Sequence, residues 1–212
     1  PLPEGLATVP EGDYVVHTAV ERLTDQAVWP VPWAQALVTQ GAYGVPEGVL
    51  NGWPVAGPGV AEQAKALIDG AEFWPVHCYA MVGVGRNMSP DTGSGAELYA
   101  VIGHAPRHLD RNIAVVGRVI SGIEHLSSLP RGTGDLGFYE DEAERVPIQS
   151  IRLATDLPAA EQPKFEYLSS ESRSFARYAD ARKNRRDPFF IKPAGGADIC
   201  NIPVPIRPVS AK

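Results

Sequence analysis

Three features are scarce in this chain of 212 residues: long apolar runs, an excess of positive charge, and cysteine. No stretch approaches the ~18 consecutive apolar residues that a membrane-spanning helix needs, so we expect no membrane partner. Lys and Arg number 19 against 25 Asp and Glu, which gives a net charge of −6. Because the phosphate backbone attracts proteins with a cationic surplus, this balance excludes a general nucleic-acid binder.

The two cysteines, Cys78 and Cys200, are too few for a disulfide scaffold. They could pair with each other, but we expect both to be buried thiols. His104 and His108 have a spacing that can bind zinc on a helix, yet Pro106 lies between them and no third ligand accompanies them. The sequence therefore predicts no metal site and no cofactor.

Glycine and proline are abundant, with 21 and 20 residues. Proline ends helices, and within sheets it is confined to edges and bulges, so the composition favours a turn-rich β protein over a helical bundle. Apolar residues make up 44% of the chain and charged residues 21%, which is typical of globular domains. A chain of this length is expected to form one domain with insertions.

Local patterns predict the secondary structure. Apolar or alternating β-prone runs predict strands at residues 73–84, 98–102, 113–116 and 148–154. Helix formers at amphipathic spacing predict helices at residues 61–68, 122–129 and 172–184. The runs at 14–20 and 33–38 fit either a strand or a helix, and three prolines make 199–209 an extended edge or strap.

Cations gather in and just after the predicted helix at 172–184, namely Arg173, Arg177, Arg182, Lys183, Arg185 and Arg186. We interpret them as a solvated face that also interacts with the dipole at the helix C-terminus. A docking patch for an acidic partner is the alternative.

The stretch from Met81 to Arg118 carries the most specific pattern in the chain. A glycine-rich loop at 93–95 leads into the predicted strand at 98–102, and a polar corner at 107–112 leads into the apolar run at 113–116. This order resembles the centre of the cyclophilin-type peptidyl-prolyl isomerases. In that family a Gly-Ser-Gln-Phe-Phe-like strand, a Trp-Leu-Asp-Gly corner and a Val-Phe-Gly-Lys-Val-like strand form the wall of the proline pocket.

The resemblance covers about residues 79–154 and implies a fold. We expect a mainly β protein, a closed antiparallel β-barrel with short helices. Residues 1–155 would form the cyclophilin-like domain, with an insertion near 57–72. Residues 156–212 would form a C-terminal extension, a helix plus an extended strap, packed on the barrel. Similar long bacterial cyclophilin-like proteins share the Gly-Ser-Gly, His-Leu-Asp-Arg-Asn and Leu-Pro-Arg-Gly elements, so we expect a bacterial source, with the cytoplasm and the periplasm both open.

The same resemblance assigns site residues in the second half of the chain. Glu97 stands where the family usually has a catalytic-site Gln, and Tyr99 stands where it has the Phe that floors the proline pocket. The remaining substrate-binding residues implied by the match are His108, in place of the family's Trp, Leu109, Ile113, in place of its His, Val84, and Gly85, whose backbone position holds the substrate carbonyl.

The first half of the chain matches the family less well. Residues 37–41 resemble the end of the strand that carries the catalytic Gln, which makes Gln40 a catalytic candidate and Leu37 and Val38 pocket residues. The family's arginine, eight positions earlier, corresponds to Pro32, and no arginine lies between Arg22 and Arg86. A competing alignment treats 34–41 as the family's early helix. The arginine strand therefore lies upstream of Pro1, or the site works without it.

The resemblance implies peptidyl-prolyl cis-trans isomerase activity that assists protein folding. Rotation about an Xaa-Pro bond needs no nucleophile and no metal, only tighter binding of the twisted bond than of either planar isomer. The expected partners are proline-containing peptides or unfolded proteins, and we expect a monomer. The alternative is a catalytically weak or inactive module that binds proline-containing segments, or a chaperone.

Overall fold

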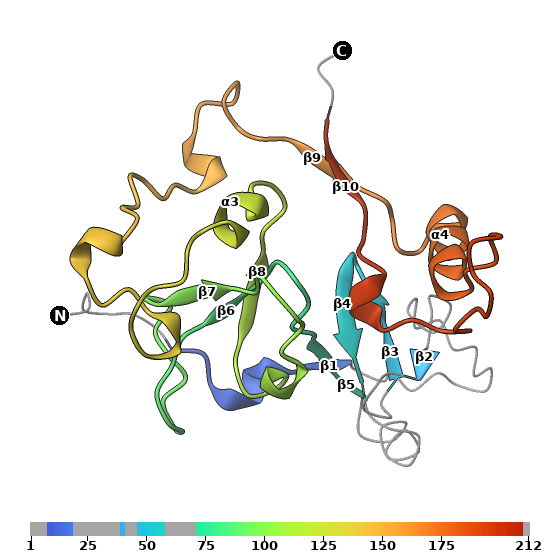
Figure 1. Ribbon diagram of the computed structural model, residues 1–212, viewed down its shortest axis with the longest axis horizontal. Coiled ribbons are helices and arrows are strands. Elements are labelled where there is room, and N and C mark those ends of the chain that lie inside the picture. The colour runs from blue at the N-terminus through green and yellow to red at the C-terminus, as the bar shows by residue number, and fades with distance from the viewer. Residues whose placement is uncertain (1–7, 19–38, 41–45, 58–70, 210–212) are drawn as a thin grey trace.

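The computed structural model describes residues 8–18, 39–40, 46–57 and 71–209 (Figure 1). The helix predicted at 61–68, the run at 33–38 and the two pocket candidates Leu37 and Val38 lie outside these ranges. The strands are β1 (Val16–Thr18), β2 (Thr39–Gln40), β3 (Pro46–Leu50), β4 (Trp53–Ala56), β5 (Ala71–Pro75), β6 (Met81–Val84), β7 (Leu98–Ala100), β8 (Val115–Arg118), β9 (Phe165–Tyr167) and β10 (Ile206–Pro208).

The prediction of a mainly β fold with few helices is confirmed. The described strands form three antiparallel sheets, in the orders β1-β5-β4-β3-β2, β7-β6-β8 and β10-β9. These sheets are small and do not close into a barrel within the part of the chain that the structure describes, so barrel closure stays a prediction. The short helices are η1 (Glu11–Tyr14), η2 (Arg107–Leu109), α3 (Ile123–Ser127), η3 (Asp135–Gly137), η4 (Glu142–Glu144), η5 (Ala154–Asp156), α4 (Arg173–Lys183) and η6 (Ile199–Asn201).

The single strand predicted at 73–84 is divided into β5 and β6. Pro75 ends β5 because it has no N–H to donate to a ladder. Ala80 has a φ of 72°, in the left-handed region that interrupts an extended strand. The chain therefore turns between the two sheets, and residues 76–80 connect them.

The prediction of a strand at 148–154 is wrong. In the structure residues 148–153 form no strand and Ala154 begins η5, and Ile148 and Ile151 expose 76% and 83% of their surface. The segment belongs to a long connection that runs along the outside of the molecule from α3 to β9 (Figure 1). Alternation of apolar and polar residues indicates a strand only where a neighbouring strand supplies hydrogen-bond partners, and none of the described strands lies beside it.

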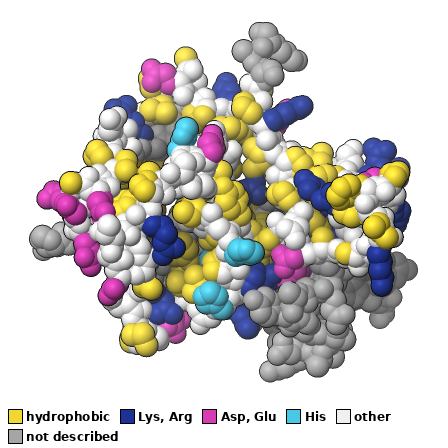
Figure 2. Space-filling model, viewed as in Figure 1, with side chains coloured by type: hydrophobic (Ala, Val, Ile, Leu, Met, Phe, Trp, Pro, Cys, Tyr) yellow, Lys and Arg dark blue, Asp and Glu magenta, His cyan; other side chains and the backbone are white. Residues whose placement is uncertain are grey.

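Both described helices of the α type lie where the sequence predicts them. The Ser172 hydroxyl accepts a hydrogen bond from Phe175 N at 3.0 Å and so caps the start of α4. Phe175 and Ala179 are fully buried, and the helix presents its cations to solvent at the right of Figure 2. The helices in the described ranges are too short or too polar to cross a bilayer.

The C-terminal extension contributes directly to the main hydrophobic core. Phe175 of α4, Ile199 of η6 and Ile202 after it are buried in one cluster with residues in or next to β3 to β7, namely Val49, Ala56, Trp74, Val76, Met81 and Val101. Burial of each large side chain contributes about 1.5–3 kcal/mol. The extension is therefore part of the folded core of the described structure, and the boundary at residue 155 stays a prediction.

Cys78 and Cys200 form a disulfide with an S–S distance of 2.08 Å. The expectation of two buried thiols is therefore wrong. The two residues are 122 positions apart in sequence, and they meet because η6 packs on the connection between β5 and β6. The sequence around each cysteine does not indicate this pairing, because the pairing depends on where the C-terminal strap crosses the core.

This disulfide predicts a large effect on stability. A crosslink over so long a loop restricts the unfolded chain, so its loss is expected to lower the free energy of unfolding by about 2–5 kcal/mol. Urea unfolding of the Cys78→Ala/Cys200→Ala variant measures the change. Dithiothreitol should lower the stability of the unmodified protein to a similar level and leave the variant unaffected. Equal stability of the two proteins without reductant would contradict the prediction.

Candidate active site

The sheet β7-β6-β8 brings four of the predicted site residues together. Gly83 pairs with Tyr99 across β6 and β7, and Val84 pairs with Leu98. Just beyond the paired strands, the Gly85 N–H donates to the Glu97 carbonyl at 2.8 Å. Val84, Gly85, Glu97 and Tyr99 are thus neighbours at one end of this sheet. The Gly85 N–H already donates to the Glu97 carbonyl, so it is not available to a substrate carbonyl without a rearrangement.

Tyr99 is held by contacts on both its ring and its hydroxyl. The ring lies against Gly83, and a Cβ at that position would collide with the end of the ring, so glycine lets the ring lie where it does. The ring also packs against the main core and is half-buried. The Tyr99 hydroxyl lies 2.9 Å from His77 Nε2. Burial, and then the negative charge of Asp110, raise the pKa of Tyr99 to about 12, so the hydroxyl keeps its proton at neutral pH.

His77 connects this tyrosine to the polar corner. His77 is fully buried, and Asp110 Oδ1 lies 2.9 Å from both its Nδ1 and its backbone nitrogen. An ionised carboxylate only accepts hydrogen bonds, so Nδ1 carries the proton and, in the neutral ring, Nε2 accepts from the Tyr99 hydroxyl. The orientation of the tyrosine ring is therefore fixed through two further residues.

Arg107, at the start of η2, supports Asp110 from the other side. Its Nε lies 2.7 Å from Asp110 Oδ2, and its NH1 lies 2.6 Å from Glu47 Oε1 and 3.4 Å from Asp198 Oδ2. The Arg107 side chain is only 5% exposed. Burial alone would raise the pKa of the Asp110 carboxyl, but hydrogen bonds from His77 and Arg107 outweigh it and hold that pKa below its usual 3.8. We call Glu47, Arg107, Asp110, His77 and Tyr99 the buried polar chain.

The remaining predicted residues lie on the corner itself. The Ile113 N–H donates to the Leu109 carbonyl at 3.1 Å, and both side chains are half-buried. His108 is exposed, and its carbonyl accepts from Asn112 Nδ2 at 3.2 Å. Asp110 joins the corner to His77, in the connection between β5 and β6. Just after the corner, the Ala114 carbonyl accepts from Val84 N of β6 at 3.1 Å.

Gln40 lies apart from this group in the sheet order. It is in β2, at the edge of the β1-β5-β4-β3-β2 sheet, and pairs with Pro46. Leu37 and Val38 are outside the described ranges. The first-half candidates therefore stay predictions.

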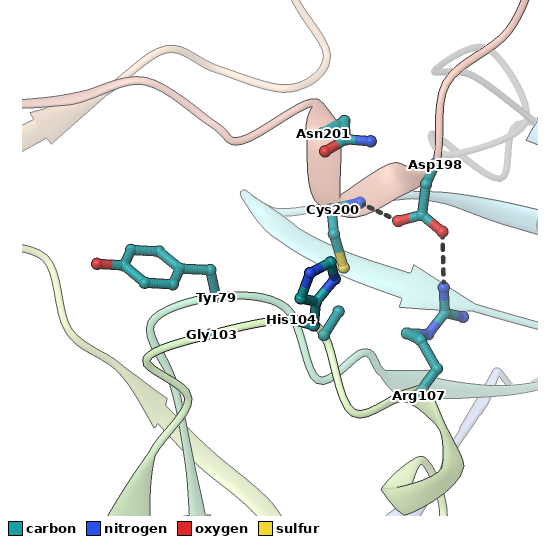
Figure 3. Close-up of a pocket in the computed structure, with 8 residues that line it drawn as sticks. Tyr79, Gly103, His104, Arg107, Asp198, Cys200 and Asn201 are labelled. Carbon is teal, nitrogen blue, oxygen red and sulfur yellow. Dashed lines mark hydrogen bonds and ion pairs between the residues drawn. The ribbon is translucent and has the colours of Figure 1, made fainter. Parts of the chain in front are cut away.

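A cavity of about 390 Å³ lies beside Arg107, where η6 meets the loops around β6 and β7 (Figure 3). Asp198 links its two sides, because one carboxylate oxygen accepts from Cys200 N and the other pairs with Arg107. The residues around this cavity are Tyr79, Gly103, His104, Ala105, Arg107, Asp198, Cys200 and Asn201. Tyr99 and Leu109 do not line it. The described residues contain no group of three or more His, Cys, Asp or Glu side chains arranged to hold a metal ion.

Sequence reasoning missed most of the buried polar chain. Asp110 lies within the corner at 107–112 that carries the family resemblance, but no pattern assigns it a role of its own, and none singles out His77. Glu47 lies in β3, 60 positions before Arg107 in sequence, and no local pattern marks it. The one available signal was an excess of polar residues inside apolar surroundings, such as His77 within the run at 73–84.

Comparison with known proteins supports the fold. No protein-family model and no curated protein sequence matches the chain. Among solved structures, the crystal structure of cyclophilin AquaCyp293 from Hirschia baltica matches with a TM-score of 0.64 and 18% sequence identity, covering 100% of this chain and 68% of that one. The chain has a cyclophilin-like fold. At this identity the cyclophilin-like fold is shared without establishing a shared activity.

The lowered pKa of Asp110 predicts a defined dependence of stability on pH. A carboxyl group whose pKa falls on folding stabilises the protein above its unfolded pKa of 3.8, and this stability is lost as the pH falls through the folded pKa. Asp110→Asn should lower the free energy of unfolding at pH 7 by about 3 kcal/mol, because it breaks a buried charge pair. The difference from the unmodified protein should narrow below about pH 4.

Urea unfolding between pH 3 and pH 7 measures both effects. Asp187→Asn, which removes an exposed carboxylate, is the matched control and should follow the unmodified protein. A difference for Asp110→Asn that is independent of pH would show that the charge of Asp110 is not what stabilises the corner.

Proposed function

We propose that the protein is a peptidyl-prolyl cis-trans isomerase that assists folding by binding the twisted Xaa-Pro bond at the corner and sheet described above. The observation that carries this proposal is the anchored tyrosine. Tyr99 lies against Gly83 and bonds to His77, beside Val84, Gly85 and Glu97. A tyrosine whose hydroxyl is already engaged presents the half-buried face of its ring as apolar surface, which suits a pyrrolidine ring.

The proposed reaction requires only binding energy. The barrier to rotation about a peptide bond is ~18–20 kcal/mol, and it falls when a site binds the twisted bond better than the planar isomers. Leu109 and Ile113 would complete the apolar slot with Tyr99, and His108 would cover its edge. Glu97 and Gln40 would hold the flanking peptide groups, with Leu37 and Val38 beside Gln40.

The structure also supports a second candidate, a module that binds proline-containing segments with little or no catalysis. Arg86 follows Gly85, but its Nε donates to the Asn112 carbonyl at 2.8 Å and its NH1 to the Asn87 carbonyl at 2.7 Å. It therefore braces the corner rather than pointing a donor at a prolyl nitrogen. Loss of a transition-state donor costs about 10²–10³ in rate at comparable sites, so we expect slow turnover.

The proposal also includes expectations about barrel closure, source, oligomeric state and compartment. A closed barrel, completed with residues outside the described ranges, would match the cyclophilin resemblance. The proposed source is bacterial and the proposed state a monomer acting on proline-containing peptides or unfolded proteins. Of the two compartments left open by the sequence, the Cys78–Cys200 disulfide favours the periplasm, because structural disulfides persist in oxidising environments.

Substitutions at Tyr99 separate the ring from the hydroxyl. Tyr99→Ala should lower kcat/KM on an Xaa-Pro peptide by at least about tenfold, because a large apolar contact with the proline is lost. Tyr99→Phe keeps that face and should remain within about threefold of the unmodified protein, although it loses the bond to His77. A protease-coupled isomerisation assay measures both variants, and circular dichroism checks that they are folded.

Tyr139→Ala is the control, because the Tyr139 hydroxyl bonds to the Pro130 carbonyl far along the exposed connection. Activity of Tyr99→Ala equal to that of the control would place the reaction elsewhere. Binding of the peptide without isomerisation by the unmodified protein would favour the binding module.

His108 predicts a weak response to cyclosporin. The family's tryptophan is replaced here by an exposed histidine, which offers less apolar surface to an inhibitor. Half-maximal inhibition should require a much higher cyclosporin concentration than for a cyclophilin with tryptophan at this corner, and His108→Trp should lower that concentration by about tenfold. Tight inhibition of the unmodified protein would contradict the assignment of His108 to the edge of the slot.

A further inference from the structure

A second cavity, of about 270 Å³, is built from three parts of the chain that are distant in sequence. The turn between β3 and β4 forms one wall, the end of β8 and the residues after it form another, and β9 supplies the third. The lining residues are Asn51, Gly52, Trp53, Val116, Gly117, Arg118, Ile120 and Tyr167. None of them is among the individual residues assigned above to the proposed isomerase site, and the proposal for this cavity does not depend on isomerase activity.

The walls of this cavity are apolar and accessible. Trp53 exposes 39% of its surface and Tyr167 exposes 52%, and Val116 and Ile120 are also exposed. Gly52 has a φ of +82°, and a Cβ there would lie 3.1 Å from Tyr167 Cε2, so glycine lets the Tyr167 ring lie against the turn. The Ser170 hydroxyl accepts from Gly52 N at 3.2 Å and fixes the turn in place. Two aromatic rings are thus held around an open hollow.

Arg118 supplies the charge of the cavity. Its guanidinium carbon lies 5.9 Å from the centre of the Trp53 ring, and its NH1 makes a long hydrogen bond of 3.4 Å to the Gly52 carbonyl. Burial lowers its pKa, and no carboxylate among the described residues pairs with it. By contrast Arg107, Arg186 and Arg207 each have an acidic partner.

We propose that this cavity binds a carboxylate carried on an apolar body, through Arg118 and the rings of Trp53 and Tyr167. A guanidinium presents parallel N–H donors that match the two oxygens of a carboxylate. The partly desolvated setting strengthens that attraction, and the rings bury the apolar portion of the ligand. A single cation and apolar walls suit a ligand with one negative charge better than a phosphate, which requires more hydrogen-bond donors.

The size of the cavity narrows the ligand further. Its volume of about 270 Å³ lies just below the range typical of sites for drug-sized molecules. It therefore suits a single residue or a molecule of that size. Two sources carry this chemistry: the last residue of a peptide with a free C-terminus, and a small free carboxylic acid.

Isothermal titration calorimetry with three probes tests the proposal on the full chain. The probes are N-acetyl-Ala-Leu with a free carboxylate, the same dipeptide as its amide, and 4-methylpentanoate. The free-acid dipeptide should bind at least about tenfold more tightly than the amide, and this preference should shrink as the salt concentration rises. Tighter binding of the dipeptide acid than of 4-methylpentanoate would identify a peptide C-terminus, and equal binding would identify the small acid; both results support the site.

Variants assign the preference to its residues. Arg118→Gln should abolish the advantage of the acid over the amide, and Trp53→Ala should weaken both ligands by a similar factor. Arg182→Gln is the matched control, because it removes an exposed guanidinium that lies over a half-buried aromatic ring, that of Tyr178, elsewhere on the protein. If Arg118→Gln does not fold, Arg118→Lys and the salt dependence of the unmodified protein give the same test. Lysine keeps the positive charge but lacks the parallel N–H donors of the guanidinium.

Three results would overturn the proposal: equal binding of the acid and amide dipeptides, no binding of any of the three probes, or a preference for the acid that survives Arg118→Gln.

Discussion

The structure depends on one buried cation, the Arg107 guanidinium. It is surrounded by Glu47 of β3, Asp110 of the corner and Asp198 at the start of η6, so a single side chain joins three parts of the chain. Taking such a charge out of water is costly, and the cost is offset only while its partners stay in place. Removal of any one of them takes away an ion pair of this buried cation, and removal of Arg107 itself leaves the buried carboxylates uncompensated, which makes the corner and the C-terminal strap depend on each other.

A second connection, between η6 and the segment that joins β5 to β6, acts in a different way. The Cys78–Cys200 disulfide restricts the unfolded chain, whereas the ion pairs of Arg107 stabilise the folded one. Both reach η6, next to Ile199 and Ile202, which are buried in the main core. The C-terminal extension is thus fixed by apolar packing, by charge and by a covalent bond at one place, and from that place the buried polar chain continues to Tyr99.

The sequence predicts those features that are set locally. The prediction of a helix at 172–184 is correct because the signals for it are local: the cap at Ser172 and the apolar residues of one face lie within a few positions of each other. Features that require a partner distant in sequence are not predictable in this way. The run at 148–154 alternates like a strand but pairs with no strand in the described structure. The residues near Cys78 do not indicate that it pairs with Cys200. The second-half site residues were found by resemblance to a family motif, and the contacts that hold them in place came only from the structure.

The central claim is that the Tyr99 ring, held by the core, by Gly83 and by the buried polar chain, forms one wall of a proline site. Solution NMR of the protein with an Ala-Pro peptide tests this most directly, through nuclear Overhauser effects between the tyrosine ring protons and the pyrrolidine protons, together with exchange peaks between the cis and trans forms of the peptide. The account predicts contacts from the proline ring to Tyr99, Leu109 and Ile113, with exchange enhanced by the protein. Contacts confined to Trp53 and Tyr167, or a peptide that binds without approaching Tyr99, would contradict it.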